Sequence, residues 1–292
     1  MKTFKEAVQT RDFTVTAKIP LTPSTDADLI REQAEILRDN IDAVLLTDNQ
    51  FGKVHMSTVA ASVLLLQNGV DPIMQLSCRN KNRIALISDL LGAAALGITS
   101  LLLVQGNKLP KGFDPRPKAV HDVNATELIA TALTMKTDEQ FESNPDFFIG
   151  GNIAPHVPDP ESVPQKLIDK IDAGAQFVQT HVCMNMDLLS NFMKHLVENN
   201  LIRRVSFIAG TAVFPTAEAA RWLKENRRNV MIPEAIIKRL KQAKDPESEG
   251  IKICTEQMQE MAEIPGVSGV NVMSGGEASA IVAAVHAANL NS

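Results

Sequence analysis

The residues of this sequence that could do chemistry follow short apolar runs, at the points where we predict buried β-strands to end. An amine such as Lys18 could donate a proton there if burial lowered its pKa. Any solvent-exposed strand end is also polar, so a single residue is a weak indication and the whole set a stronger one. The set comprises Lys18, Thr47-Asp48-Asn49-Gln50, Ser77-Cys78-Arg79, Gln105-Gly106-Asn107, Gly150-Gly151-Asn152, Thr180-His181, Gly210-Thr211 and Ser274-Gly275-Gly276.

Zinc chemistry is an alternative, because Cys78 and Cys183 follow strand candidates and His181 lies near the second of them. Zinc sites usually show short ligand spacings such as CxxC or HxxxH, and these residues have none. We therefore predict no metal. The only other cysteine is Cys254, and so sparse and odd a count indicates a reducing compartment without a disulfide framework.

The elements that must position these residues alternate along the whole chain. Eight apolar strand candidates are each followed by helical patterns, with no Pro/Ser-rich linker and no GxGxxG after the first strand. This order predicts a single α/β domain over residues 1–292, a closed (β/α)8 TIM barrel with its working face at the C-terminal strand ends. The expected strands are 13–19, 43–47, 72–77, 100–105, 146–153, 177–181, 204–210 and 267–273. The expected helices are 26–40, 57–67, 82–96, 125–135, 164–173, 186–199, 216–225, 233–242, 246–262 and 277–288.

Composition excludes some classes of partner. A net charge of −5 gives no basic surface for nucleic acid, and one Trp with no Tyr offers little for base stacking. The first residues lack the apolar segment of a signal peptide, and 84–104 reads as a helix running into a buried strand rather than a membrane span. We expect a cytoplasmic protein that binds neither nucleic acid nor membrane.

Several segments together resemble the methylenetetrahydrofolate reductase family along nearly the whole chain. They are VTAKI, DAVLLTDNQ, VHMST, PIMQLSCRNKNRIALISDLLGAAALGI, KIDAGAQFVQTH, MIPEAIIKRL and IPGVSGVNVM. The resemblance implies an enzyme of one-carbon metabolism, an oxidoreductase on a (β/α)8 barrel. Such an enzyme binds a reduced folate and FAD, and reduces the folate-borne methylene group through the flavin, with NAD(P)H as a candidate reductant. It also implies flavin contacts for Thr47, Gln75, Gly106 and Lys170.

Three residues at positions that are functional in the family differ from the family pattern. Lys18 stands where the family has the carboxylate that serves as general acid. Asn107 ends a Gln105-Gly106-Asn107 segment where the family has a GD pair, and His181 replaces a folate-contacting amide. A lysine cation about 4 Å from the iminium formed by methylene-folate opening would oppose it by roughly 1 kcal/mol in a water-like medium. By resemblance, Lys18, Asn107 and His181 are the catalytic candidates, and Gln105, Asn107 and His181 the folate-binding candidates.

These departures leave three hypotheses open. The first is a methylenetetrahydrofolate reductase-like flavoenzyme. The second is a methyltransferase, of a demethylase type, which moves a methyl group to or from tetrahydrofolate without flavin hydride transfer. The third is a non-catalytic folate-binding subunit, so a homo-oligomer or a partner subunit stays open. His55 and Arg79 flank the expected site, where either could hold the folate glutamate or a cofactor phosphate.

Overall fold

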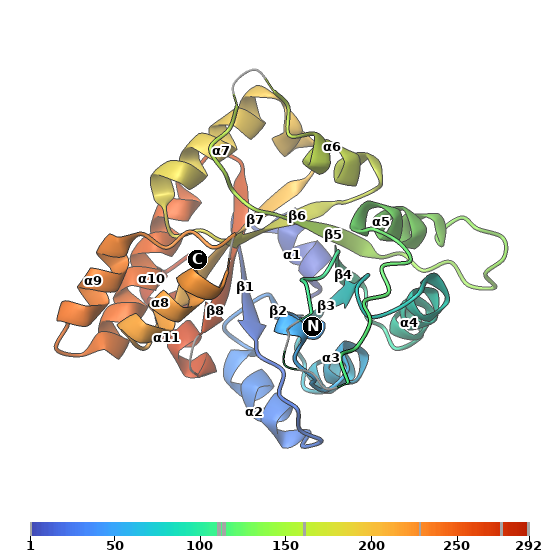
Figure 1. The fold of residues 1–292 in the computed structure, drawn as a ribbon, viewed down its shortest axis with the longest axis horizontal. Coiled ribbons are helices and arrows are strands. Elements are labelled where there is room, and N and C mark those ends of the chain that lie inside the picture. The colour runs from blue at the N-terminus through green and yellow to red at the C-terminus, as the bar shows by residue number, and fades with distance from the viewer. Residues whose placement is uncertain are drawn as a thin grey trace.

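Eight parallel strands close into a barrel in the computed structural model of the chain, which confirms the predicted fold (Figure 1). The structure describes residues 2–109, 112, 115–159, 162–227, 229–274 and 277–290. Strands pair in sequence order, and β8 pairs with β1 to close the sheet. They are β1 (Thr14–Ile19), β2 (Ala43–Leu46), β3 (Pro72–Ser77), β4 (Ser100–Val104), β5 (Phe148–Ile153), β6 (Phe177–Val182), β7 (Ser206–Val213) and β8 (Val267–Ser274).

Helices surround the barrel (Figure 1). Amphipathic helices bury an apolar stripe against it. In α7 (Met186–Glu198) four residues three or four positions apart are buried: Leu189, Phe192, Met193 and Leu196. No helix in the described ranges is long and apolar enough to cross a membrane. The other helices are α1 (Phe4–Thr10), α2 (Asp28–Leu37), α3 (Thr58–Gln67), α4 (Arg83–Ala95), α5 (Ala125–Thr134), α6 (Gln165–Asp172), α8 (Ala217–Asn226), α9 (Glu234–Gln242), α10 (Pro246–Ala262) and α11 (Ala278–Ala288). Short 3-10 turns are Gln50–Gly52 and Leu201–Arg203.

The first helix was not predicted from the sequence, and it packs into the barrel. The Thr3 side chain accepts a hydrogen bond from the Glu6 N–H, and the Glu6 carboxylate accepts one from the Thr3 N–H, so the start of α1 is capped at both residues. Phe4 is fully buried, with its ring centroid 5.5 Å from that of Phe148 and 5.1 Å from that of Phe177. α1 therefore fills the end of the barrel where the strands begin.

An additional helix pair stands between β7 and α10. α8 and α9 pack on an apolar cluster that includes Phe214, Leu223 and Ile237. The segment joining them runs alongside the extension of β6, where Met231 and Cys183 form an isolated parallel bridge. The insertion of α8 and α9 brings the segment between them over the C-terminal ends of the strands.

Two expected strand ends need correction. The seventh strand was expected to end at residue 210, but β7 continues to Val213, because Gly210, Thr211 and Ala212 pair with β8. Gly210-Thr211 is therefore strand interior rather than strand end. For the eighth strand, Ser274 is the last residue of β8, and the expected Gly275-Gly276 lies outside the described residues.

Candidate functional site

Alternation along the strands decides which side chains face the barrel axis. Leu45, Leu102, Phe148 and Phe177 belong to one buried cluster inside the barrel. Positions two or four residues farther along the chain therefore also face inward, toward the C-terminal end, which we call the mouth. These inward positions are Thr47, Gly106, Asn152 and His181, joined by Gln75 after Ile73 and by Lys18 after Thr14 and Thr16.

Polar side chains form the floor below the mouth. The Asn271 amide donates a hydrogen bond to Thr16 Oγ1 at 2.8 Å, and the Gln179 amide donates to Asn271 Oδ1 at 3.3 Å. Thr16 in turn donates to the Val270 carbonyl at 3.1 Å. Lys18 lies two residues after Thr16 on the same strand face, so its amine stands above this polar layer.

A chain of polar contacts joins Lys170 to His181 along one side of the mouth, where β5 pairs with β6. Lys170 reaches in from α6 and donates from Nζ to the Asn152 carbonyl oxygen, with Asn152 Oδ1 at 3.5 Å. Asn152 Nδ2 lies 3.2 Å from His181 Nε2. Because Lys170 can only donate, it orients the Asn152 amide with its oxygen outward and its NH2 toward the imidazole. His181 Nε2 then accepts, and Nδ1 carries the proton of the neutral ring.

Burial and like charge lower the pKa values of Lys18 and His181 in the mouth. Burial, followed by the charge of Arg227, lowers the pKa of Lys18 to about 7. Burial also lowers the pKa of His181 to about 4, with further contributions from Lys18, Lys170 and Arg227. At neutral pH the imidazole is therefore uncharged, and Lys18 is close to half protonated.

Arg227 is a site residue that sequence reasoning missed. It comes directly after α8, in the segment that crosses the strand ends, and it lowers the pKa of both Lys18 and His181. Burial lowers its own pKa to about 10, which leaves the guanidinium charged at neutral pH. In the sequence it belongs to the polar run KENRRN between two helices, and such a run is typical of a solvated loop.

Arg79 belongs to the scaffold of the mouth. Its side chain is 1% exposed, and three of its nitrogens donate hydrogen bonds within the protein. Nη1 donates to the Asn107 carbonyl at 3.1 Å, Nη2 to the Asn49 carbonyl at 2.8 Å, and Nε to Asn80 Oδ1 at 2.8 Å. Arg79 thus ties the loops after β2, β3 and β4 together, and that it could also hold a folate or cofactor anion stays a prediction.

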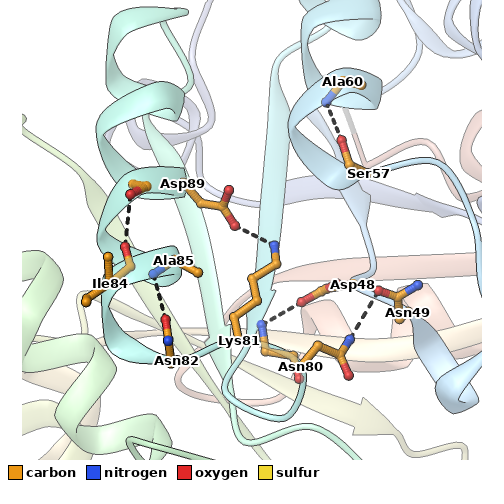
Figure 2. Close-up of polar contacts among 12 residues, drawn as sticks. Asp48, Asn49, Ser57, Ala60, Asn80, Lys81, Asn82, Ile84, Ala85 and Asp89 are labelled. Carbon is orange, nitrogen blue, oxygen red and sulfur yellow. Dashed lines mark hydrogen bonds and ion pairs between the residues drawn. The ribbon is translucent and has the colours of Figure 1, made fainter. Parts of the chain in front are cut away.

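The same loops are fixed by a second set of contacts (Figure 2). The Asn80 amide donates to Asn49 Oδ1 at 3.1 Å, and Lys81 forms an ion pair with Asp89 of α4. Asp48 is 5% exposed and accepts a hydrogen bond from the Ser77 N–H at 2.9 Å. Burial raises the pKa of Asp48 despite nearby cations, and its hydrogen bond from Ser77 fixes the end of β3.

Gln105 and Asn107 lie differently from the other predicted site residues. Gln105 accepts a hydrogen bond from the Ala125 N–H at 3.1 Å and lies 2.9 Å from His121 Nδ1, so both ends of its amide serve the start of α5. Its side chain points away from the barrel axis, and the structure does not bring it to Lys18. Asn107 is exposed, and no hydrogen bond joins its side chain to Lys18 or His181 in the described part of the chain.

Gly106 lets the backbone pass close to β3. Its φ is +84°, and a Cβ there would lie 2.2 Å from Ser77 Oγ and 2.7 Å from Arg79 Cβ. Only glycine combines this backbone conformation with so close an approach. The flavin-side candidates Thr47, Gln75 and Gly106 therefore follow one another along β2, β3 and β4, while Lys170 enters from α6.

The thiols do not form a metal site. Cys78, Cys183 and Cys254 are buried, and burial raises their pKa values to about 11, 11 and 12. No group of three or more His, Cys, Asp or Glu side chains that could hold a metal ion occurs among the described residues. The zinc alternative thus has no ligand set in this part of the chain.

Two hollows on the surface lie away from the mouth. One, of about 530 Å³, is lined by residues next to the starts of β2 and β3, including Arg38, Asp42 and Asp71. The other, of about 520 Å³, lies between the loop after β5 and α7, beside Val157 and His195. Neither contains any of the predicted site residues.

Comparison with known proteins agrees with this architecture. The family model described as methylenetetrahydrofolate reductase matches residues 4–288. A search of curated proteins found no significant match. A solved structure described as an uncharacterized protein from Clostridium thermocellum that binds two copies of 5-methyl-5,6,7,8-tetrahydrofolic acid is similar, with a TM-score of 0.70. It is 15% identical in sequence, and the similarity covers 97% of this chain and 97% of that one, so it supports the fold. Because the family model covers nearly the whole sequence, this chain belongs to the methylenetetrahydrofolate reductase family.

Proposed function

We propose that this protein binds a reduced folate in the barrel mouth and reduces its one-carbon unit as an enzyme of the methylenetetrahydrofolate reductase type. Family membership supports the reaction class. The ligand described for the Clostridium thermocellum protein, 5-methyltetrahydrofolate, supports the ligand class. The observation that carries the proposal is the group of Lys18, His181, Asn152 and Lys170, which joins titratable and hydrogen-bonding side chains at the end of the barrel where such enzymes work.

The residues on one side of the mouth fit FAD. Thr47 is buried, Gly106 keeps the backbone free of a side chain, and Lys170 provides a cation at the entrance. The Gln75 amide has no hydrogen-bond partner among the described residues and can face a polar ring edge. FAD bound there would supply hydride transfer. Thr47, Gln75, Gly106 and Lys170 would hold and orient it.

Lys18 is the proton donor in this proposal. A general acid works best when its pKa is close to the operating pH, and burial brings the pKa of Lys18 to about 7. His181 stays neutral and donates through Nδ1, because its Nε2 accepts from Asn152. Lys18 can therefore protonate a folate nitrogen while His181 orients the pterin. These roles replace the carboxylate and the amide that the family pattern has at these positions.

Methyl transfer is a second candidate, and the charge of the mouth favours it. Arg227 is charged and Lys18 is about half protonated at neutral pH, and among the described residues no carboxylate contributes to the pKa of Lys18 or His181. An iminium cation formed from methylene-folate would be repelled there, whereas methyl transfer from 5-methyltetrahydrofolate forms no such cation. In that reaction a nucleophilic second substrate would form a bond to the methyl carbon as the N5–carbon bond breaks, and Lys18 would supply the proton that N5 needs to leave as an amine. A non-catalytic folate-binding subunit would use the same mouth without either reaction.

Flavin binding and folate binding separate these candidates. We expect the purified protein, reconstituted with excess FAD, to show the yellow flavin absorbance, and to reduce methylenetetrahydrofolate with NADH or NADPH. Calorimetry should detect binding of 5-methyltetrahydrofolate whether the protein is a reductase or a methyltransferase. A colourless protein that still binds the folate would reject the reductase and leave methyl transfer, and loss of both signals would reject folate chemistry altogether.

Substitution of Lys18 by glutamate tests the altered site. In an ordinary reductase, Lys18→Glu restores the family's carboxylate, so methylene-folate reduction should stay equal or improve. In a site rebuilt for other chemistry, Lys18→Glu places negative charge where a cation is needed, and both folate binding and turnover should fall. Robust wild-type reduction that Lys18→Glu preserves would reject the rebuilt site.

A further inference from the structure

We propose that Lys18 is a nucleophile that takes a one-carbon unit at the oxidation level of formaldehyde and holds it covalently, as an iminium on its side-chain nitrogen. The carbon comes from the methylene bridge of a bound folate or from free formaldehyde. The proposal deepens the proposed function and rests on it for the folate source only. It gives Lys18 a carbon-transfer step that follows its role as proton donor.

Lys18 projects from the inner face of β1, next to the C-terminal end of the strand. Thr16, two residues earlier, belongs to the polar floor, where it accepts a hydrogen bond from Asn271 at 2.8 Å. Side chains two positions apart on a strand point to the same face, so Lys18 stands one layer nearer the mouth. Its register partners, Leu45 of β2 and Met273 of β8, carry no charge. The amine therefore lies at the end of the barrel where such folds carry out their chemistry.

The Lys18 amine has no structural role. It is partly buried, yet it makes no hydrogen bond or ion pair with any residue that the structure describes. By contrast, Lys170 donates to the Asn152 carbonyl, and Lys81 pairs with Asp89. A buried polar group without a partner costs stability, and such costs are characteristic of functional positions. An amine that no carboxylate holds is free to lose its proton and attack a carbon atom.

Loss of water makes this amine reactive at neutral pH. Burial is the main reason that the pKa of Lys18 falls to about 7. About half of the molecules then carry the neutral amine, whereas an ordinary lysine side chain is neutral in only roughly 0.04% of molecules at pH 7. The lone pair that attacks carbon exists only in the neutral form. Lysines desolvated in this way are the ones that form Schiff bases with carbonyl compounds.

Transfer from the folate needs no added co-reactant. Protonated Lys18 gives a proton to N10 as the N10–carbon bond of methylenetetrahydrofolate breaks, which leaves an N5 iminium beside a neutral amine. The amine nitrogen then forms a bond to the methylene carbon, and one of its protons passes to N5 as the N5–carbon bond breaks. The products are tetrahydrofolate and the Lys18 iminium. With formaldehyde, neutral Lys18 adds to the carbonyl carbon, and one proton is taken up as water leaves, which gives the same iminium.

Reductive trapping tests the nucleophile. Cyanoborohydride converts a lysine iminium into N-methyllysine, which peptide mass spectrometry assigns to a residue. We would treat the protein at pH 7 with cyanoborohydride and either one equivalent of formaldehyde, or methylenetetrahydrofolate together with dimedone as a formaldehyde scavenger. Lys18 should be methylated at least about tenfold more than Lys166, an exposed lysine of α6, because its amine is far more often neutral than that of an ordinary lysine.

Arginine at position 18 separates nucleophilicity from charge. In the folate arm, each N-methyllysine formed at residue 18 should be matched by one molecule of tetrahydrofolate. Lys18→Arg keeps a cation but has no nucleophilic amine, so it should form no tetrahydrofolate while it still binds 5-methyltetrahydrofolate in calorimetry. Lys166→Arg is the matched change at the control lysine and should behave like wild type.

The outcomes also separate the two carbon sources. Methylation of Lys18 by methylenetetrahydrofolate despite the scavenger identifies the folate as the source. Methylation by formaldehyde alone, in a protein that binds 5-methyltetrahydrofolate, identifies free formaldehyde. Methylation by formaldehyde in a protein that binds no folate would reject the proposed function and keep the nucleophile. The proposal is wrong if folded protein shows no more methylation at Lys18 than at Lys166 in both arms.

Discussion

Folding removes much of the water around the Lys18 amine, and no carboxylate of the described residues lowers the cost of its charge. Its pKa falls from 10.5 to about 7, which means that the folded protein disfavours the ammonium form. Below pH 7 the lysine is protonated in both states, and the folded state bears the full cost. Between pH 7 and 10.5 the unfolded chain holds more protons, so stability rises with pH. A residue that destabilises its own fold is typical of functional sites.

Replacement of Lys18 by methionine should therefore stabilise the unliganded protein. Methionine has a similar length and no charge to desolvate. We expect Lys18→Met to raise the free energy of unfolding on the order of 1 kcal/mol at pH 7, after discounting for partial exposure. The gain should shrink as the pH rises toward 10. Urea denaturation at a series of pH values measures it, and an equal gain at all pH values would contradict the assignment of the cost to charge.

Glycines within helices show how an element depends on its neighbours. Gly250 lies in α10, and a Cβ at this position would lie 1.9 Å from the Phe214 carbonyl oxygen. Gly92 lies in α4, and a Cβ there would meet nothing within 4 Å. Helix propensity favours alanine equally at both positions, so only packing distinguishes them.

Alanine at these two positions should have opposite effects. Gly92→Ala should stabilise by about 0.5–1 kcal/mol, because alanine loses less backbone entropy in a helix. Gly250→Ala should destabilise by about 1–3 kcal/mol, because α10 must move away from the chain at Phe214. Thermal unfolding of the two variants side by side measures both. Stabilisation by Gly250→Ala would mean that α10 packs less closely than described.

At the scale of the whole molecule, α1 closes the barrel at the end opposite the mouth, and in Figure 1 it lies within the ring of outer helices. Phe4 fills the axis between Phe148 and Phe177, and its N–H donates to the buried carboxyl of Asp71 at 2.7 Å. Burial raises the pKa of Asp71 to about 6. The packing of α1 on the barrel thus combines an apolar contact, made by the Phe4 ring, with a hydrogen bond to a titratable group, the Asp71 carboxyl.

Removal of the Phe4 ring from α1 should lower the free energy of unfolding. Phe4→Ala removes a fully buried ring, and such changes usually cost about 3–5 kcal/mol. Gln9→Ala, at an exposed position of the same helix, should change stability by less than about 0.5 kcal/mol. Chemical denaturation compares them. Equal stability of the two variants would show that α1 does not seal the barrel in solution.

Asp71 should make stability depend on pH in the acidic range. Its folded pKa of about 6 lies above the ordinary pKa of an aspartate side chain, so the folded state holds the proton more tightly. Stability should therefore fall as the pH rises from about 4 to about 6, as far as this group contributes. Asp71→Asn keeps an acceptor for the Phe4 N–H and removes the titration. The variant should be more stable than wild type at pH 7, with the difference vanishing below pH 4, as denaturation curves would show.

The sequence by itself determined the order of the elements and the family. Strand alternation and helical spacing are local patterns, so runs such as 72–77 and 186–199 could be assigned residue by residue, and eight of them in order predict the barrel. The same patterns placed Lys18 and Thr47 at the ends of strand candidates. Helix α1 was not predicted, because its seven residues are too few to show a clear helical period of apolar positions.

Only the tertiary structure decided how side chains from distant segments share the mouth. From the sequence, Arg79 was a candidate for anion binding and Gln105 a candidate for folate binding. Only the structure showed their hydrogen bonds to Asn49, Asn107 and Ala125, which tie both side chains to neighbouring loops. Arg227 reaches the mouth through the fold of α8 and α9, which no local pattern encodes. Charges act through space, so the pKa values of Lys18 and His181 depend on neighbours that the chain brings together only when it folds.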